Sequence, residues 1–315
     1  MSGTHAIILS LFLCFLFTIP LFGTRFFTYT ITCALIWGIL VMAYDLICGY
    51  TGIVSLGHSV LYGMGAYSVG ILSVMILKVT NPLILILSAI ALGAFLGLIL
   101  GFLCSFSRGV YALLVSFAFA QIFWLFVMAD PLHITNGESG ITGLRPPPLN
   151  LGGFTLDLFR GNGLYYLVLI VFLISYTLIR MITNSQFGFI LKGIKENEDR
   201  LRSLGYDTRQ YKMLAFTLSG IFSAIAGVLT AFLENAISPG IVHWITGAQI
   251  LLMEILGGQG TLIGPVIGSF LVTFLKFWSG ENWVYYLASL YILVVMFLPR
   301  GLWGVLQDLL AKLRK

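Results

Sequence analysis

Residues 82–105 read PLILILSAIALGAFLGLILGFLCS, a stretch without a charged side chain. Runs of about 18 or more apolar residues are long enough to cross the hydrocarbon core of a bilayer as a helix. The stretch therefore predicts a transmembrane helix over these residues.

The whole chain shares this character. Of its 315 residues, 59% are hydrophobic and 9% are charged, against roughly 25% charged residues in ordinary soluble domains. A soluble protein of this composition could not cover its surface with polar groups. We therefore expect an integral membrane protein. Its expected partners, on the sequence as a whole, are the membrane and a small-molecule substrate, with no nucleic acid.

Ten apolar runs predict an all-α, polytopic bundle of about ten spans in a single transmembrane domain, residues 1–315. The first run lacks the basic flank and the cleavage site of a signal peptide, so we expect it to be retained as a helix. The eighth is short and ends at Gly257 and Gly258, so it is either a full span or a re-entrant element. The runs are 6–22, 27–47, 58–77, 82–105, 109–129, 163–182, 210–233, 244–256, 264–278 and 283–298.

The distribution of Lys and Arg predicts the orientation. With ten alternating spans, twelve basic residues fall on one face and five on the other, and the richer face is expected to be cytoplasmic. That face holds the hydrophilic segment 183–212, the tail 300–315 and both termini. The segment 130–162, rich in Gly, Pro and Asn, then lies outside. The tail is either an amphipathic helix on the inner leaflet or a frayed end.

Two glycine-containing segments interrupt the apolar runs: GYTGIVSLGH at 49–58 and LGGQGTLIGPVIG at 256–268. We name them the first and the second break. Transporters use broken helices to direct helix ends at a solute, but tight turns followed by small-residue packing would give the same pattern.

Two acidic residues border the breaks. Asp45 and Glu254 are expected to line a pathway or cap broken helices, or else to lie at an interface with access to water. His58 is either a solute contact or a hydrogen-bonded structural residue. The candidate pathway residues are Asp45, Gly49, Thr51, Gly52, Ser55, Gly57, His58, Glu254, Gly257, Gly258, Gly260 and Thr261.

The segment FGFILKGIKENEDRLRSLGYDTRQYK, residues 187–212, predicts a short amphipathic helix that ends near Gly205. Its density of charges and apolar anchors favours docking of a soluble partner, while the alternative is a solvated connector against the bilayer. The candidate docking residues are Lys195, Glu196, Asn197, Glu198, Arg200, Leu201, Leu204 and Gly205.

No motif in the sequence predicts a catalytic or metal site. Cys14, Cys33, Cys48 and Cys104 fall in or beside apolar runs without a CxxC pair, which is typical of buried thiols. The glycine-rich segments lack the G-x-x-x-x-G-K-[ST] pattern that binds nucleotide phosphates. We therefore expect no cofactor in this chain, and any ATP hydrolysis must take place in another subunit.

Five segments, in this order along nearly the whole chain, resemble the LivM-type permeases of branched-chain amino acid ABC importers. Two departures stand out: Ile53 replaces the usual Gln, and residues 136–139 read NGES where the family usually has GGSD. The matching segments are 49–58, 136–144, 193–212, 216–239 and 256–265.

The resemblance implies more than the residues themselves indicate. It implies the ABC importer permease fold in a bacterial inner membrane, a homologous LivH-type permease, two ATPase subunits that hold ATP-Mg, and a periplasmic or lipid-anchored binding protein. Residues 193–207 would be the coupling helix that docks on an ATPase. The implied activity is import of branched-chain or other small amino acids by alternating access.

Other solutes and another class of transporter stay open. Members of the same group also move urea, short amides and other small organic solutes. The permease pair could consist of two different chains or of two copies. An ion-coupled transporter working alone, with Asp45 or Glu254 as the ion ligand, is the alternative from another class, and the charged docking segment argues against it.

Overall fold

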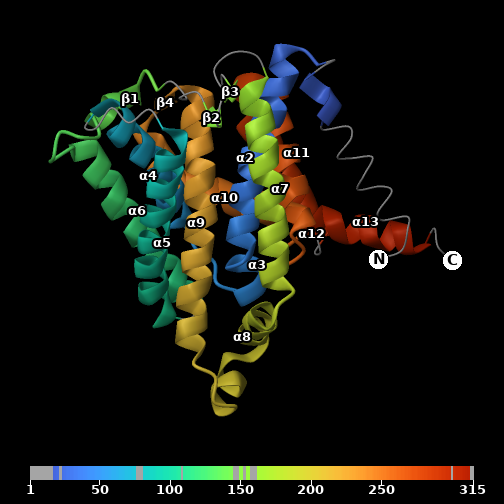
Figure 1. The fold of residues 1–315 in the computed structure, drawn as a ribbon. Coiled ribbons are helices and arrows are strands. Elements are labelled where there is room, and N and C mark those ends of the chain that lie inside the picture. Colours follow the sequence, from blue (N-terminus) through green and yellow to red (C-terminus); the bar gives the residue numbers. More distant parts are fainter. Residues whose placement is uncertain are drawn as a thin grey trace.

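The computed structural model describes residues 17–20, 23–75, 81–107, 109–144, 149–151, 154–156, 162–298 and 301–312. Long helices lying side by side make up most of these residues (Figure 1). The helices are α2 (Arg25–Asp45), α3 (Cys48–Thr51), α4 (His58–Gly70), α5 (Pro82–Ser105), α6 (Val110–Ala129), α7 (Gly163–Thr183), α8 (Gln186–Ser203), α9 (Thr208–Glu234), α10 (Trp244–Gly257), α11 (Ile263–Ser279), α12 (Trp283–Phe297) and α13 (Gly301–Lys312). A π-helical turn, η1 (Ile71–Met75), extends α4, and short 3₁₀ turns are η2 (Gly137–Ser139), η3 (Pro239–Val242) and η4 (Gly280–Asn282).

The helices agree closely with the predicted spans. Nine of the ten predicted runs begin and end within two residues of a helix, counting η1 as part of α4. The predicted run 6–22 lies outside the described residues except for 17–20, which are helical. Within the described ranges, five helices are long and apolar enough to span a membrane, namely α2 with α3, α5, α6, α7 and α9, while α10, α11 and α12 are shorter apolar helices. The all-α class is confirmed, and the number of ten spans stays a prediction.

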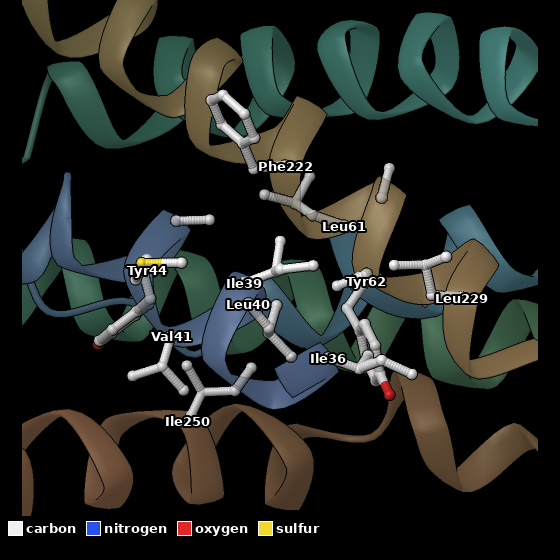
Figure 2. Packing of buried hydrophobic residues seen from close by; sticks show 14 of the residues in the cluster. Ile36, Ile39, Leu40, Val41, Tyr44, Leu61, Tyr62, Phe222, Leu229 and Ile250 are labelled. Carbon is white, nitrogen blue, oxygen red and sulfur yellow. The ribbon is translucent and has the colours of Figure 1, made fainter. Parts of the chain in front are cut away.

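The helix α2 forms the centre of the bundle. From Gly38 to Asp45 it is buried on every side, as expected for a helix that is apolar all round. Figure 2 shows side chains of α2 packed among those of α4, α9 and α10. By contrast, α6 and α12 expose large apolar side chains such as Tyr111, Ile122 and Met296, which suits helices that face lipid.

Glycines allow α5 and α9 to pack backbone to backbone. A Cβ atom at Gly93 would lie 2.5 Å from the carbonyl oxygen of Gly220, and one at Gly97 would lie 2.6 Å from that of Phe216. Gly101 continues the same face one turn further along α5. Small residues at such intervals let membrane helices gain van der Waals contact where the hydrophobic effect contributes little.

The two ends of the bundle differ. Short antiparallel strands lie at one end, with β1 (Ile141–Thr142) paired to β4 (Ala236–Ile237) and β2 (Leu149–Leu151) paired to β3 (Phe154–Leu156). The helix α8 projects from the other end (Figure 1). The described parts of segment 130–162 and the segment 183–212 therefore lie at opposite ends of the bundle, and we call these the strand end and the α8 end. Which end faces the cytoplasm stays a prediction.

The C-terminal segment forms the helix α13 rather than a frayed end. Its first residue, Gly301, has a φ of +67° and lies so close to Gly258 that a Cβ atom would be 2.6 Å from the Gly258 Cα. The helix is thereby anchored to the second break. Arg300, Arg314 and Lys315 of the predicted basic tail lie outside the described residues.

Replacing Gly93 with Val is expected to destabilise the bundle by about 1–3 kcal/mol, because the added methyl groups would collide with the α9 backbone. The control is Ala91→Val, two residues away on an exposed face of α5. Thermal unfolding of the purified protein in detergent should show a Tm several degrees lower for the first variant. Equal melting temperatures for the two variants would contradict the packing described here.

Candidate functional site

The two breaks, far apart in sequence, are in direct contact. A Cβ atom at Gly49 would lie 2.5 Å from the backbone nitrogen of Gly260 and would overlap the carboxylate of Asp45. Only glycine fits at position 49, because any side chain would separate the two segments. The structure thus joins the two candidate pathway segments into one junction at the α8 end of α2.

Asp45 holds this junction together through its carboxylate. It is fully buried at the end of α2 and accepts hydrogen bonds from the backbone N–H groups of Gly260, at 2.6 Å, and Leu262, at 3.1 Å. Leu262 immediately precedes α11 and has a φ of +58°, a conformation uncommon for a residue other than glycine. A negative charge at a helix N-terminus is favourable, so Asp45 caps the second break.

Glu254 is the second buried acid at the junction. It is as fully buried as Asp45, and the two carboxyl groups lie within hydrogen-bonding reach of each other. Among the described residues, no donor from another group reaches the carboxyl oxygens of Glu254. The charged groups that act on it are Asp45 and Lys195. The predicted alternative of an interfacial position with access to water is wrong for both acids. Burying two neighbouring carboxyl groups is costly, and a buried acid is a common mark of a functional position in a membrane protein.

Lys195 connects α8 to the first break. Its Nζ donates a hydrogen bond of 2.8 Å to the carbonyl oxygen of Gly49, and its aliphatic part lies against Gly52, where a Cβ atom would be 3.0 Å from the lysine Cγ. Nearby, the Lys192 ammonium lies 5.2 Å from the centre of the Tyr50 ring. The sequence predicted Lys195 as a docking residue for a partner, but its ammonium group points into its own chain.

His58 occupies a structural position in the first break. Ser219 Oγ donates to the carbonyl oxygen of Ala43 at 2.6 Å, so it accepts from His58 Nε2 at 2.9 Å. Ser55 Oγ accepts from Gly57 N and lies 3.2 Å from His58 Nδ1, to which its hydroxyl can donate. This pattern requires a neutral imidazole protonated at Nε2. Of the two roles predicted for His58, the structure favours the structural one.

Side chains of other helices satisfy the backbone of the first break. The N–H of Ser55 donates to the hydroxyl of Tyr44 at 3.2 Å, and the N–H of Leu56 donates to Ser116 Oγ at 3.0 Å. Irregular backbone at membrane depth requires such partners. Sequence analysis missed Tyr44, Ser116 and Ser219, because a single hydroxyl residue within an apolar run carries no distinguishing pattern.

The other predicted pathway residues shape the two breaks locally. Thr51 and Gly52 end α3, the latter with a φ of +75°. Thr261 Oγ1 donates to Gly258 O at 2.9 Å and accepts from Gly264 N at 3.0 Å. Three of the predicted residues lie on the side of the first break that faces α5, α6 and α9: Ser55, Gly57 and His58. The others meet at the junction or lie beside it: Asp45, Gly49, Glu254 and Gly260, with Gly257, Gly258 and Thr261 next to them.

A cavity of about 500 Å³ adjoins the second break at the α8 end. Gln259 and Thr261 of the break, Lys195 of α8 and Trp303 of α13 line it. The junction therefore borders an open space on this side of the bundle. Within the residues that the structure describes, no group of three or more potential metal ligands occurs.

The predicted docking helix is present but is not continuous. Asn197 has non-helical angles (φ −161°, ψ 96°) that kink α8, and its Oδ1 accepts from Arg200 N at 3.0 Å, which starts the second part. Gly205, with a φ of +91°, provides the predicted turn after the helix. The exposed docking candidates are Lys195, Glu196, Asn197, Arg200, Leu204 and Gly205.

Glu198 joins the second part of α8 to the start of α9. It accepts from Lys212 Nζ at 2.8 Å, Arg202 at 2.7 Å and Thr208 Oγ1 at 2.9 Å. Burial raises the pKa of Glu198, but the bonds and charges of these neighbours outweigh burial and hold the pKa below its usual range. The contact therefore contributes stability above the unfolded value of about pH 4.3 and loses it as the pH falls through the lowered pKa.

Known proteins are similar in sequence to this chain over most of its length. Residues 26–299 match the family described as "Branched-chain amino acid transport system / permease component". The chain belongs to this permease family. It is 26% identical over 296 residues to the high-affinity branched-chain amino acid transport system permease protein LivM of Escherichia coli K12, covering 86% of this chain and 68% of that protein.

Other relatives of this permease match over shorter parts of the chain. The probable branched-chain amino acid transport permease protein LivM of Methanocaldococcus jannaschii is 26% identical, covering 60% of this chain and 55% of the relative. The autoinducer 2 import system permease protein LsrC of Yersinia pseudotuberculosis is 32% identical, covering 30% of this chain and 28% of the relative. No solved structure matches the permease. The chain is thus a membrane permease of a transport family.

Replacing Asp45 with Ala is expected to cost the permease about 2–4 kcal/mol, because two buried N–H groups lose their acceptor. Asp45→Asn keeps one acceptor oxygen and should cost less. Thermal unfolding in detergent gives the ranking, and hydrogen exchange at residues 258–263 should be fastest in the Ala variant. Unchanged exchange in that variant would show that Asp45 does not hold the second break.

Proposed function

We propose that this chain is the permease subunit of an ATP-driven importer and forms half of a translocation pathway for branched-chain or other small amino acids. The observation that carries the proposal is the junction of the two breaks, to which α8 is joined through Lys195. The permease family to which the chain belongs supports the amino-acid class. The junction would move between two arrangements and open the pathway to each side in turn.

The coupling step is proposed to begin at α8. Its exposed residues Glu196, Arg200 and Leu204 lie at the end of the bundle opposite the strands. An ATPase that binds there would shift the first part of α8, and the shift would reach Gly49 through Lys195 and the second break through Asp45. Each step is a direct contact, so no long-range pathway has to be invoked.

The remaining parts of the proposed importer lie in other chains. We expect a homologous permease to supply the other half of the pathway, two ATPase subunits with ATP-Mg to bind at α8, and a solute-binding protein to dock at the strand end. In this proposal the α8 end would lie in the cytoplasm of a bacterial cell and the strand end outside its inner membrane.

One observation favours a second candidate, an ion-coupled transporter that works alone. Glu254 and Asp45 are two buried carboxyl groups within hydrogen-bonding reach of each other, and buried acids bind protons or cations in ion-driven transporters. Reconstitution separates the two candidates. The importer needs ATP and the partner subunits for leucine uptake, whereas uptake by the purified chain alone under an ion gradient would establish the second candidate.

Reversing the charge at Glu196 or replacing Gly205 with Val is expected to weaken ATPase binding at least fivefold. Glu196 is exposed on α8, and Val at position 205 cannot adopt the φ of +91° without strain. Co-purification of tagged ATPase subunits measures the effect. Glu138→Lys, an exposed site at the strand end, is the control. Normal co-purification and uptake in both α8 variants would remove α8 as the docking element.

Replacing Lys195 with Met is expected to separate ATP hydrolysis from transport. The ATPase should still bind and hydrolyse ATP, while solute uptake per ATP falls at least tenfold, because the link from α8 to Gly49 is lost. Lys195→Arg retains a cation of similar reach and should recover part of the uptake. An unchanged ratio of uptake to hydrolysis in the Met variant would show that Lys195 does not couple the two.

A further inference from the structure

A second, polar cavity lies toward the strand end of the same helices. It has a volume of about 50 Å³ and opens between α2, α9, α10, α11 and α12. Glu234 is the last residue of α9, just before β4, and Lys276 lies in the last turn of α11. Both side chains are exposed at its mouth. The cavity thus opens on the side where the proposed importer would receive its solute.

The cavity is directly connected to the junction by shared helices. Gln249 lines the cavity, and Glu254 of the junction follows five residues later on α10. Trp37 lines it from α2, the helix that ends at Asp45. A ligand in this cavity would therefore touch two of the helices that meet at the break junction.

The cavity holds one acidic and one basic side chain, Glu234 and Lys276, that are not in contact as an ion pair. Glu234 and Lys276 interact electrostatically across the cavity, but they do not form an ion pair. The ion pairs among the described residues join Glu198 to Arg202 and to Lys212. The Lys276 ammonium lies 5.6 Å from the centre of the Trp283 ring. Glu234 stands at the C-terminus of α9, where the helix dipole disfavours a negative charge, so helix stability gives no reason for this carboxylate.

The floor of the cavity has an unused polar group. Thr273 is 3% exposed, and its hydroxyl has no hydrogen-bond partner in the described part of the chain. Buried hydroxyl groups without partners are uncommon in folded proteins. Together with the amide of Gln249, this hydroxyl offers a ligand both a donor and an acceptor between the two charged groups.

We propose that this cavity binds the charged head of a zwitterionic amino acid. The ammonium group would lie toward Glu234, the carboxylate toward Lys276 and the Thr273 hydroxyl, and Trp37 with Trp283 would flank the ligand. This inference rests on the proposed function and deepens it. The cavity holds only a few groups of the size of a water molecule, so the head enters and the apolar side chain of the amino acid stays at the mouth.

The same charges discriminate between the solutes that the sequence left open. An amino acid pairs both Glu234 and Lys276, whereas urea or a short amide carries no charge and would leave both groups desolvated without a counter-charge. A site built for a charged or hydrogen-bonding group rejects an analogue that lacks it far more strongly than an apolar pocket rejects a shape change. The cavity therefore favours amino acids over neutral amides.

The first test measures ATP-driven leucine uptake by the complete complex in proteoliposomes with saturating binding protein. Glu234→Gln and Lys276→Met should each lower uptake at least tenfold with basal ATP hydrolysis intact. The controls Glu138→Gln and Arg25→Gln, exposed at the same end, should stay within twofold of the unmodified complex. Uptake within twofold in both cavity variants would overturn the inference while leaving the proposed function in place. Absence of leucine uptake by the unmodified complex would instead refute the proposed amino-acid transport.

The second test does not depend on the binding protein or on uptake. Tyr29 lines the cavity and is 37% exposed. A cysteine introduced there by Tyr29→Cys, with Cys14, Cys33, Cys48 and Cys104 replaced by Ala, serves as a reporter for a small thiol reagent. Leucine should slow its modification at least threefold in the complex, while 3-methylbutanamide, an uncharged analogue, should not. The Lys276→Met variant should lose the protection. Equal protection by both compounds, or none by leucine, would overturn the zwitterion assignment.

Discussion

The site depends on the carboxylate of Asp45, which accepts hydrogen bonds from two backbone N–H groups. The irregular segment 258–262 leaves the backbone N–H groups of Gly260 and Leu262 without a helical partner inside the bundle, where an acceptor is required. Asp45 supplies that partner from another helix. It also fixes the end of α2 against the start of α11, which brings Gly49 against Gly260. The buried carboxyl group is tolerated here because both of its oxygens accept hydrogen bonds.

Glycine makes the second contribution, because it allows backbones to approach where side chains would not fit. Gly49 lets the two breaks touch, while Gly93 and Gly220 let α5 and α9 pack along their lengths. The contact at Gly49 forms the junction, and the contact between Gly93 and Gly220 forms the closely packed pair of α5 and α9. The helix α8 is joined to the junction rather than to this helix pair, since Lys195 donates a hydrogen bond to Gly49. A movement of α8 therefore acts directly on the breaks.

The helices α2, α10 and α11 carry polar groups at two depths. Toward the strand end they border the cavity of Glu234 and Lys276, and toward the α8 end they carry the junction of Asp45 and Glu254. Apolar side chains such as Ile39, Leu40 and Ile250 fill the region between (Figure 2). In the proposed importer, the cavity would receive the solute and the junction would act as a gate, both on the same helices. This is the arrangement that half of an alternating-access pathway requires.

The sequence alone determined the helices, the two breaks, the segment of α8 and the family resemblance. These features depend on apolar runs, on glycine positions and on hydrogen bonds within a few residues, all of which are local. The tertiary structure decided which groups meet. Lys195 reaches Gly49 across 146 residues and Asp45 reaches Gly260 across 215, and Glu234 faces Lys276 from a different helix. Such pairings depend on the rotation and depth of each helix in the bundle. The sequence of an apolar helix does not determine its rotation and depth, because packing against the neighbouring helices sets both.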